Sequence, residues 1–162
     1  MVAAFALQAA AGSRKRLFTL VYVLGVGVTT LLSNDATAIV LTPAVYAVIK
    51  TVNGDPMPYL FACALIANAA SFVLPISNPA NLVVFGSNLP SLLPWLRTFL
   101  LPACGAIFAT YLTLRILFWK DLRGPLPDVV EELRLSPGGK LAILGVIVTA
   151  VLLLCVLRPG DR

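Results

Sequence analysis

Two short polar stretches interrupt long apolar runs in this chain of 162 residues, and both contain a Ser-Asn pair. The first, Ser33-Asn34-Asp35, lies within "TLLSNDATAIVLTP", and the second, Ser77-Asn78-Pro79, lies within "PISNPAN". An interrupted helix leaves N–H and C=O groups free, and Ser and Asn side chains add neutral donors and acceptors. Such a pair of breaks is suited to binding a small polar solute without a fixed opposite charge.

Asp35 is the only charged residue between Leu17 and Ile49. A charged carboxylate at the centre of a membrane helix costs roughly 2.5–3.5 kcal/mol or more. The side chain avoids that cost by binding a proton or a cation, so Asp35 is a candidate coupling group. A structural alternative is that Asn34 or Asp35 caps the helix that follows. Capping and ion binding are not exclusive.

The composition predicts an integral membrane protein. The chain is 59% hydrophobic and only 12% charged, whereas soluble proteins carry about 25% charged residues. Basic residues cluster at Arg14–Arg16 and in the stretch 120–140, as is typical of cytoplasmic loops. The chain has no histidine, its cysteines lack metal-ligand spacing, and no basic, aromatic-interleaved face indicates nucleic-acid binding. We therefore expect no metal, no cofactor and no nucleic-acid partner.

The run 17–49 favours a re-entrant helical hairpin with "SNDA" at its tip over one long helix. A single helix would be roughly 50 Å long, whereas the hydrocarbon core is about 30 Å thick. A hairpin also returns Lys50 to the side of Arg14–Arg16, as the positive-inside rule prefers. Gly25 and Gly27 would let its first arm pack closely against a neighbour.

A broken transmembrane helix is predicted over 59–89, because two prolines in Pro75–Asn81 disfavour continued helix. Its first half is expected to reach residue 74, and "PSLLPWLR" is expected at the membrane interface. The remaining predicted segments are a span over 98–118, a cytoplasmic connector over 120–140 and a further helix over 141–158. The predicted fold is all-α, with residues 1–119 as a transport-type membrane module.

The segments "LSNDATAIVLTP" and "ANAASFVLPISNPANLVVFG" resemble the paired signatures of the arsenite efflux permeases, the arsenical pump membrane proteins of the ion transporter superfamily. The resemblance implies two inverted repeats, each with a re-entrant hairpin and a broken helix that meet at mid-membrane. It also implies that this chain is one half of such a transporter: a fragment with most of the first repeat, in which 141–158 opens the second.

By this resemblance the protein is a multi-pass inner-membrane secondary transporter, not an enzyme, that exports arsenite or antimonite by proton antiport. Dicarboxylate carriers of the superfamily have Thr at the third tip position, where this chain has Asp35; this departure argues against a dicarboxylate substrate and favours proton coupling. The alternatives are a sodium/proton antiporter, a sodium-coupled anion transporter, or a non-transporting scaffold. The expected partners are a small inorganic solute and membrane lipid; a homodimer and an arsenite-stimulated ATPase are left open. The candidate substrate- and ion-binding residues are Ser33, Asn34, Asp35, Thr37, Ser77, Asn78 and Asn81.

Overall fold

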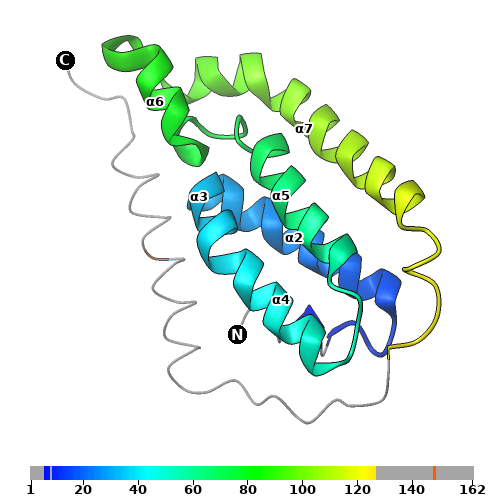
Figure 1. The fold of residues 1–162 in the computed structure, drawn as a ribbon. Coiled ribbons are helices and arrows are strands. Elements are labelled where there is room, and N and C mark those ends of the chain that lie inside the picture. The colour runs from blue at the N-terminus through cyan, green and yellow to red at the C-terminus, as the bar shows by residue number, and fades with distance from the viewer. Residues whose placement is uncertain (1–5, 8, 127–147, 149–162) are drawn as a thin grey trace.

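The computed structural model describes residues 6–7, 9–126 and 148, and these residues form helices joined by short turns (Figure 1). The only strand-like pairing in that part is an isolated antiparallel bridge between Ser13 and Pro125. Most of the predicted connector and of the helix over 141–158 lies outside the described residues. The elements are α2 (Arg14–Leu31), α3 (Asn34–Ala36), the π-helix η1 (Thr37–Leu41), α4 (Thr42–Thr51), α5 (Met57–Ala69), the 3₁₀-helix η2 (Pro75–Ser77), α6 (Pro79–Phe85), the 3₁₀-helix η3 (Gly86–Asn88) and α7 (Leu92–Leu117).

The run 17–49 folds as a helical hairpin and not as one long helix. Helix α2 ends at Leu31, the backbone of Ser33 is fully extended, and the chain returns through α3, η1 and α4. The two arms lie side by side and run in opposite directions (Figure 1). The reversal therefore occurs at the polar stretch that the sequence marks as the tip.

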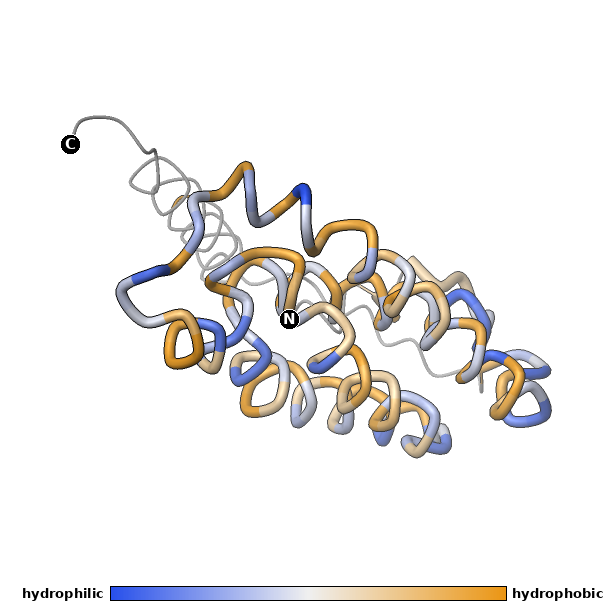
Figure 2. The backbone as a smooth tube through the Cα atoms, turned by 90° about the horizontal axis from the view of Figure 1, so that it is seen from above, coloured by the Kyte–Doolittle hydropathy of each residue, from blue (hydrophilic) through white to orange (hydrophobic). Residues whose placement is uncertain are grey.

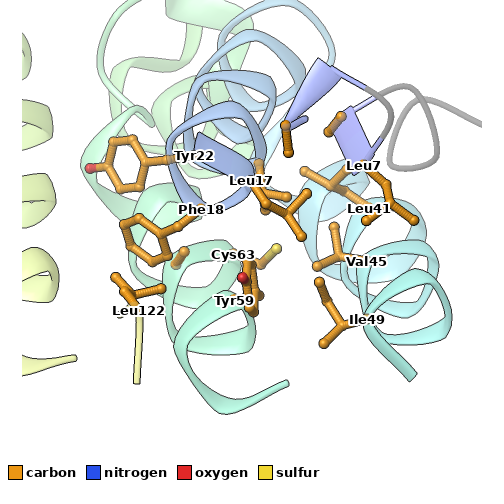
Figure 3. Close-up of a cluster of buried hydrophobic side chains, with 14 of the residues drawn as sticks. Leu7, Leu17, Phe18, Tyr22, Leu41, Val45, Ile49, Tyr59, Cys63 and Leu122 are labelled. Atoms are coloured by element: carbon orange, nitrogen blue, oxygen red, sulfur yellow. The ribbon is translucent and has the colours of Figure 1, made fainter. Parts of the chain in front are cut away.

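Helix α5 packs against both arms of the hairpin, and the apolar core lies between these helices. Figure 3 shows part of this core, with residues from α2, α4 and α5 pointing toward one another. A Cβ atom built on Gly25 of α2 would lie 2.7 Å from Cγ2 of Ile66 in α5, whereas one on Gly27 meets nothing within 4 Å. Only Gly25 therefore serves the close helix approach that the sequence suggested for both glycines.

The second break begins earlier than predicted. Helix α5 ends at Ala69 instead of residue 74, and α6 begins at Pro79, inside the stretch expected to be unwound. Proline is favoured at the first position of a helix because its missing N–H would have no intrahelical partner there. The Asn78 side chain accepts a hydrogen bond from the Ala80 N–H and caps the new helix. The irregular segment is thus 70–78, and Asn81 belongs to α6.

Helix α7 has 26 residues and is the one described helix long and apolar enough to cross a membrane. It begins at Leu92, so "PSLLPWLR" is mostly its first turns and not a separate interfacial segment. Much of its surface away from the bundle is apolar: Leu101 and Ile116 are 82% and 76% exposed. Hydrophobic residues are spread along all the helices of the bundle (Figure 2), and many of them, such as Val83 and Ile39, are exposed. Such a surface suits a lipid environment.

Candidate functional site

The hairpin tip is capped by Ser33. Its Oγ accepts a hydrogen bond from the Ala36 N–H at 3.1 Å, as an N-cap side chain does. The expectation that Asn34 or Asp35 is the cap is therefore wrong: both lie within the first turn of the returning helix. Asp35 is exposed in that turn. The Asp35 carboxylate is therefore not needed to cap the start of the returning helix.

The two arms of the hairpin are joined by a buried pair of hydroxyls. Thr29 Oγ1 and Thr37 Oγ1 lie 2.7 Å apart, and both residues are 0% exposed. One hydroxyl donates to the other, so each satisfies its partner inside the core. Thr37, a predicted site residue, thus faces the opposite arm and holds the tip in place.

Replacing Thr29 by Val should destabilise the fold by about 1–3 kcal/mol, because the Thr37 hydroxyl would be left buried without its partner. Thr37→Val should cost a similar amount for the same reason. The double variant should cost less than the sum of the two, because it leaves neither hydroxyl orphaned. Unfolding in mixed detergent micelles measures all three, and strict additivity would contradict a direct hydroxyl pair.

The returning arm widens into a π-helix directly after the tip. The Thr42 N–H bonds to the Thr37 carbonyl, five residues back, and the Thr42 hydroxyl bonds to the same oxygen at 2.9 Å. Pro43, the next residue, has no N–H to continue an α-helical ladder. The wider turn accommodates this missing donor, and π-bulges of this kind are frequent at functional sites.

The second break touches the first through Ser77. The Ser77 hydroxyl donates to the Thr30 carbonyl at 2.9 Å and accepts from the Leu74 N–H at 3.1 Å. The Thr30 carbonyl is one of the C-terminal acceptors that α2 cannot satisfy within itself. Two segments separated by more than forty residues therefore meet at the end of α2.

Asn78 and Asn81 shape the second break from inside. Asn78 Oδ1 is 2.9 Å from the Ala80 N–H, and Asn81 Nδ2 donates to the Ser71 and Pro75 carbonyls at 3.1 and 3.3 Å. Asn81 is 3% exposed. The Asn78 oxygen satisfies an N–H at the start of α6, and the Asn81 amide N–H groups satisfy two carbonyls of the irregular segment. In this arrangement both side chains hold the backbone in position.

Two oxygens near the tip lack hydrogen-bond partners among the described residues. They are Thr30 Oγ1 and Asn34 Oδ1, and both atoms are buried. Buried polar atoms are usually satisfied, so such exceptions often mark binding sites. Sequence reasoning missed Thr30, because a threonine inside a helix commonly bonds back to its own backbone. The available signal was its position one turn before the break.

Trp95 supports the second break from α7. Its Nε1–H donates to the Phe72 carbonyl at 3.0 Å, and its ring lies 4.4 Å from Phe99 and 5.4 Å from Phe85, centroid to centroid. It is 0% exposed, so its side chain faces the interior of the bundle. The indole lies inside because Phe72 offers a free carbonyl and an aromatic neighbourhood.

Trp95→Phe should lower stability by about 1–3 kcal/mol, because the phenyl ring fills most of the space but cannot donate to the Phe72 carbonyl. Trp119→Phe is the matched control, since Trp119 is 50% exposed and the same substitution there should change stability by less than about 0.5 kcal/mol. Thermal unfolding in detergent compares the two variants. Equal losses would contradict a structural role for the Trp95 indole N–H.

The region where the breaks meet carries one carboxylate and no cation. Asp35 is the only charge between Leu17 and Ile49, and the run from Pro56 to Leu96 has none. The polar groups there are the exposed Asp35 carboxylate, the buried Thr30 and Asn34 oxygens that lack a hydrogen-bond partner among the described residues, and backbone at the broken helix ends. This chemistry suits a proton or cation together with a neutral solute rich in hydroxyl groups.

Comparison with known proteins agrees with a transport role. A family model described as citrate transporter (CitMHS) matches residues 1–161. The chain is 32% identical over 118 residues to an arsenical pump membrane protein of Escherichia coli, covering 68% of this chain and 27% of that protein. It is 35% identical over 137 residues to a putative arsenical pump membrane protein of Bacillus subtilis, covering 79% of this chain and 30% of that protein.

A silicon efflux transporter of Oryza sativa subsp. japonica is 33% identical over 94 residues, which cover 58% of this chain and 19% of the rice protein. No solved structure matches the chain significantly. The chain spans less than a third of the length of these curated relatives. The match over 1–161 nevertheless includes both helix breaks, and the chain therefore belongs to the citrate transporter family of membrane transport proteins.

Proposed function

We propose that this chain provides the first-repeat half-site of a secondary transporter that exports arsenite or antimonite in exchange for protons. The observation that carries the proposal is the meeting of two helix breaks through the hydrogen bond from Ser77 to the Thr30 carbonyl, together with the one acid, Asp35, in the first of these breaks. Arsenous acid is largely uncharged at neutral pH and presents hydroxyl groups. Neutral oxygens at the tip match it, and the names of the bacterial relatives support this solute.

In this proposal Asp35 carries the proton. An exposed carboxylate at the start of the returning helix can exchange a proton with water, and its ionised form can accept a hydrogen bond from a solute hydroxyl during export. Loss of the proton on the other side of the membrane would restore the carboxylate. Coupling follows if Asp35 must be protonated before the solute-free carrier returns.

The other site residues fall into two groups, according to whether their side chains already make hydrogen bonds within the chain. Asn34 and Thr30 have oxygens without a hydrogen-bond partner in the described part of the chain and are the proposed solute ligands. Ser33, Thr37, Asn78 and Asn81 are engaged in caps and hydrogen bonds within this chain, and Ser77 bridges the breaks. We assign these five to positioning. The proposed contact residues are Thr30, Asn34 and Asp35.

The proposed setting is the inner membrane, with a multi-pass topology and a re-entrant hairpin. The breaks of a second, inverted repeat would complete the site at mid-membrane, and the hairpin-bearing module would move against a scaffold to give alternating access. A sodium/proton antiporter remains the alternative with the same fold, since an exposed carboxylate and helix-end carbonyls also suit Na⁺.

A sodium-coupled anion transporter is the second candidate, and the description of the matching family as citrate transporter favours it. Citrate carries several negative charges at neutral pH. The runs on either side of the two breaks contain no Lys or Arg between Leu17 and Ile49 or between Pro56 and Leu96, so this half-site supplies no opposite charge. A neutral solute therefore fits the described groups better.

The test is transport by a chimera in which this chain replaces the matching segment of the Escherichia coli arsenical pump membrane protein. Everted vesicles are acidified inside, and uptake of radiolabelled arsenite is measured with and without a proton ionophore. The proposal expects uptake that the ionophore abolishes and that citrate does not inhibit. Uptake that requires sodium and is blocked by citrate would instead support the anion transporter, and an inserted chimera with no arsenite uptake would refute the proposal.

A further inference from the structure

A basic depression lies at the end of the bundle opposite the helix breaks. It has a volume of about 490 Å³ and is formed between the first turns of α2 and the last turns of α7, whose ends lie near each other (Figure 1). No acidic side chain is among the described residues that line it. Its polar and larger apolar lining residues are Lys15, Arg16, Thr19, Leu20, Tyr111 and Arg115.

A hydrogen bond between two hydroxyls joins the walls of this depression. Thr19 Oγ1 lies 2.8 Å from the Tyr111 hydroxyl and also donates to the Lys15 carbonyl at 3.0 Å. Because the single Thr19 proton goes to that carbonyl, Tyr111 is the donor between the two hydroxyls. Both protons are thereby used, and the spacing of α2 and α7 is set at this level.

The cationic groups are held at the walls of the depression. The Arg115 guanidinium carbon lies 5.8 Å from the centroid of the Tyr111 ring, and Arg16 is exposed on the facing helix. Lys15 Nζ lies 5.7 Å from the centroid of Trp119. Three positive charges around one cavity, with no acid among the described lining residues, attract an anion. Guanidinium groups bind phosphate oxygens in a bidentate manner.

The position of the depression points to a lipid as the source of that anion. It lies at the C-terminal end of α7, the helix with the length and composition of a membrane span. Ile116 and Leu117, which follow the lining residue Arg115 in the sequence, are 76% and 65% exposed. Trp119 is half exposed, and the Arg123 guanidinium carbon lies 3.8 Å from the centroid of its ring. Exposed apolar residues followed by aromatic and basic ones are typical of the headgroup boundary.

We propose that this depression binds the phosphate group of an anionic phospholipid. Arg16 and Arg115 hold the phosphate from opposite helices, and Lys15 lies at the rim. Leu20 and the exposed apolar residues at the end of α7 contact the acyl chains. The bound lipid would brace α2, the first hairpin arm, against α7. The site does not depend on the transported solute, because it lies at the far end of α2 from the breaks.

The test measures lipid retention by the purified chain with native mass spectrometry in neutral detergent. Dioleoylphosphatidylglycerol is titrated against dioleoylphosphatidylcholine, which has the same chains and phosphate but no net charge. Wild type should retain the anionic lipid preferentially. Because each Lys or Arg near an anionic headgroup contributes roughly a fivefold change in affinity, Arg16→Gln with Arg115→Gln should weaken retention by about 25-fold.

Lys50→Gln with Arg97→Gln is the matched control, because it removes the same charge from two exposed positions outside the depression. It should leave retention unchanged; an equal loss would show attraction by net charge alone and overturn the site. Arg16→Gln by itself, on an exposed side chain, should still weaken binding about fivefold if the double variant fails to fold. Equal retention of both lipids, or displacement by millimolar inorganic phosphate, would overturn the assignment to an anionic lipid.

Discussion

Asp35→Asn is expected to reduce proton-driven arsenite uptake by the chimera to the background of vesicles without it. Asparagine has nearly the same shape and still accepts a hydrogen bond, but it cannot bind and release a proton. Asp35 is the only carboxylic acid between Leu17 and Ile49, so no other acid in the hairpin can replace it. The measurement is the initial rate of arsenite uptake at several imposed pH gradients.

Asp55→Asn is the matched control for this substitution. Asp55 lies in the turn before α5, and its Oδ1 accepts a hydrogen bond from the Met57 N–H at 3.0 Å, which an asparagine oxygen can also accept. Transport by the control should equal that of the unmodified chimera. Both variants should unfold within about 0.5 kcal/mol of it, because both side chains are exposed. An Asp35→Asn chimera that still transports in proportion to the pH gradient would remove Asp35 from the coupling step.

Gly25→Val is expected to destabilise the fold by about 3 kcal/mol or more. A Cβ atom at Gly25 would already lie 2.7 Å from Ile66 Cγ2, and valine adds two further carbons at this contact. Ile66 is 0% exposed, and its β-branched side chain has essentially one favourable rotamer in a helix, so it cannot swing away. The measurement is the free energy of unfolding in mixed detergent micelles.

Gly27→Val provides the control on the same helix. A Cβ atom at Gly27 meets nothing within 4 Å, and valine has a higher helix propensity than glycine. This variant should therefore be as stable as wild type or slightly more stable. Adding Ile66→Ala to Gly25→Val should recover part of the loss, because the colliding methyl group is removed. Equal losses at Gly25 and Gly27 would contradict the close approach of α2 and α5.

The membrane class and the approximate places of both helix breaks could be predicted from the residues alone. A chain with 12% charged residues has too few polar groups to cover a water-facing surface, and prolines or polar clusters inside apolar runs interrupt helices by local means. The single acid at Asp35 is likewise visible in the sequence. These features depend on local backbone chemistry and on the free energy of transferring side chains from water to lipid. Neither requires knowing which distant segments pack together.

The roles of individual side chains at the breaks required the tertiary structure. Ser33 and not Asp35 caps the returning helix, Trp95 lies inside the bundle, and Ser77 bonds to the Thr30 carbonyl. Each assignment depends on which free donor or acceptor a distant segment brings within hydrogen-bond distance. The difference between Gly25 and Gly27 has the same origin, because only the packing of α5 decides which face of α2 has no room for a side chain.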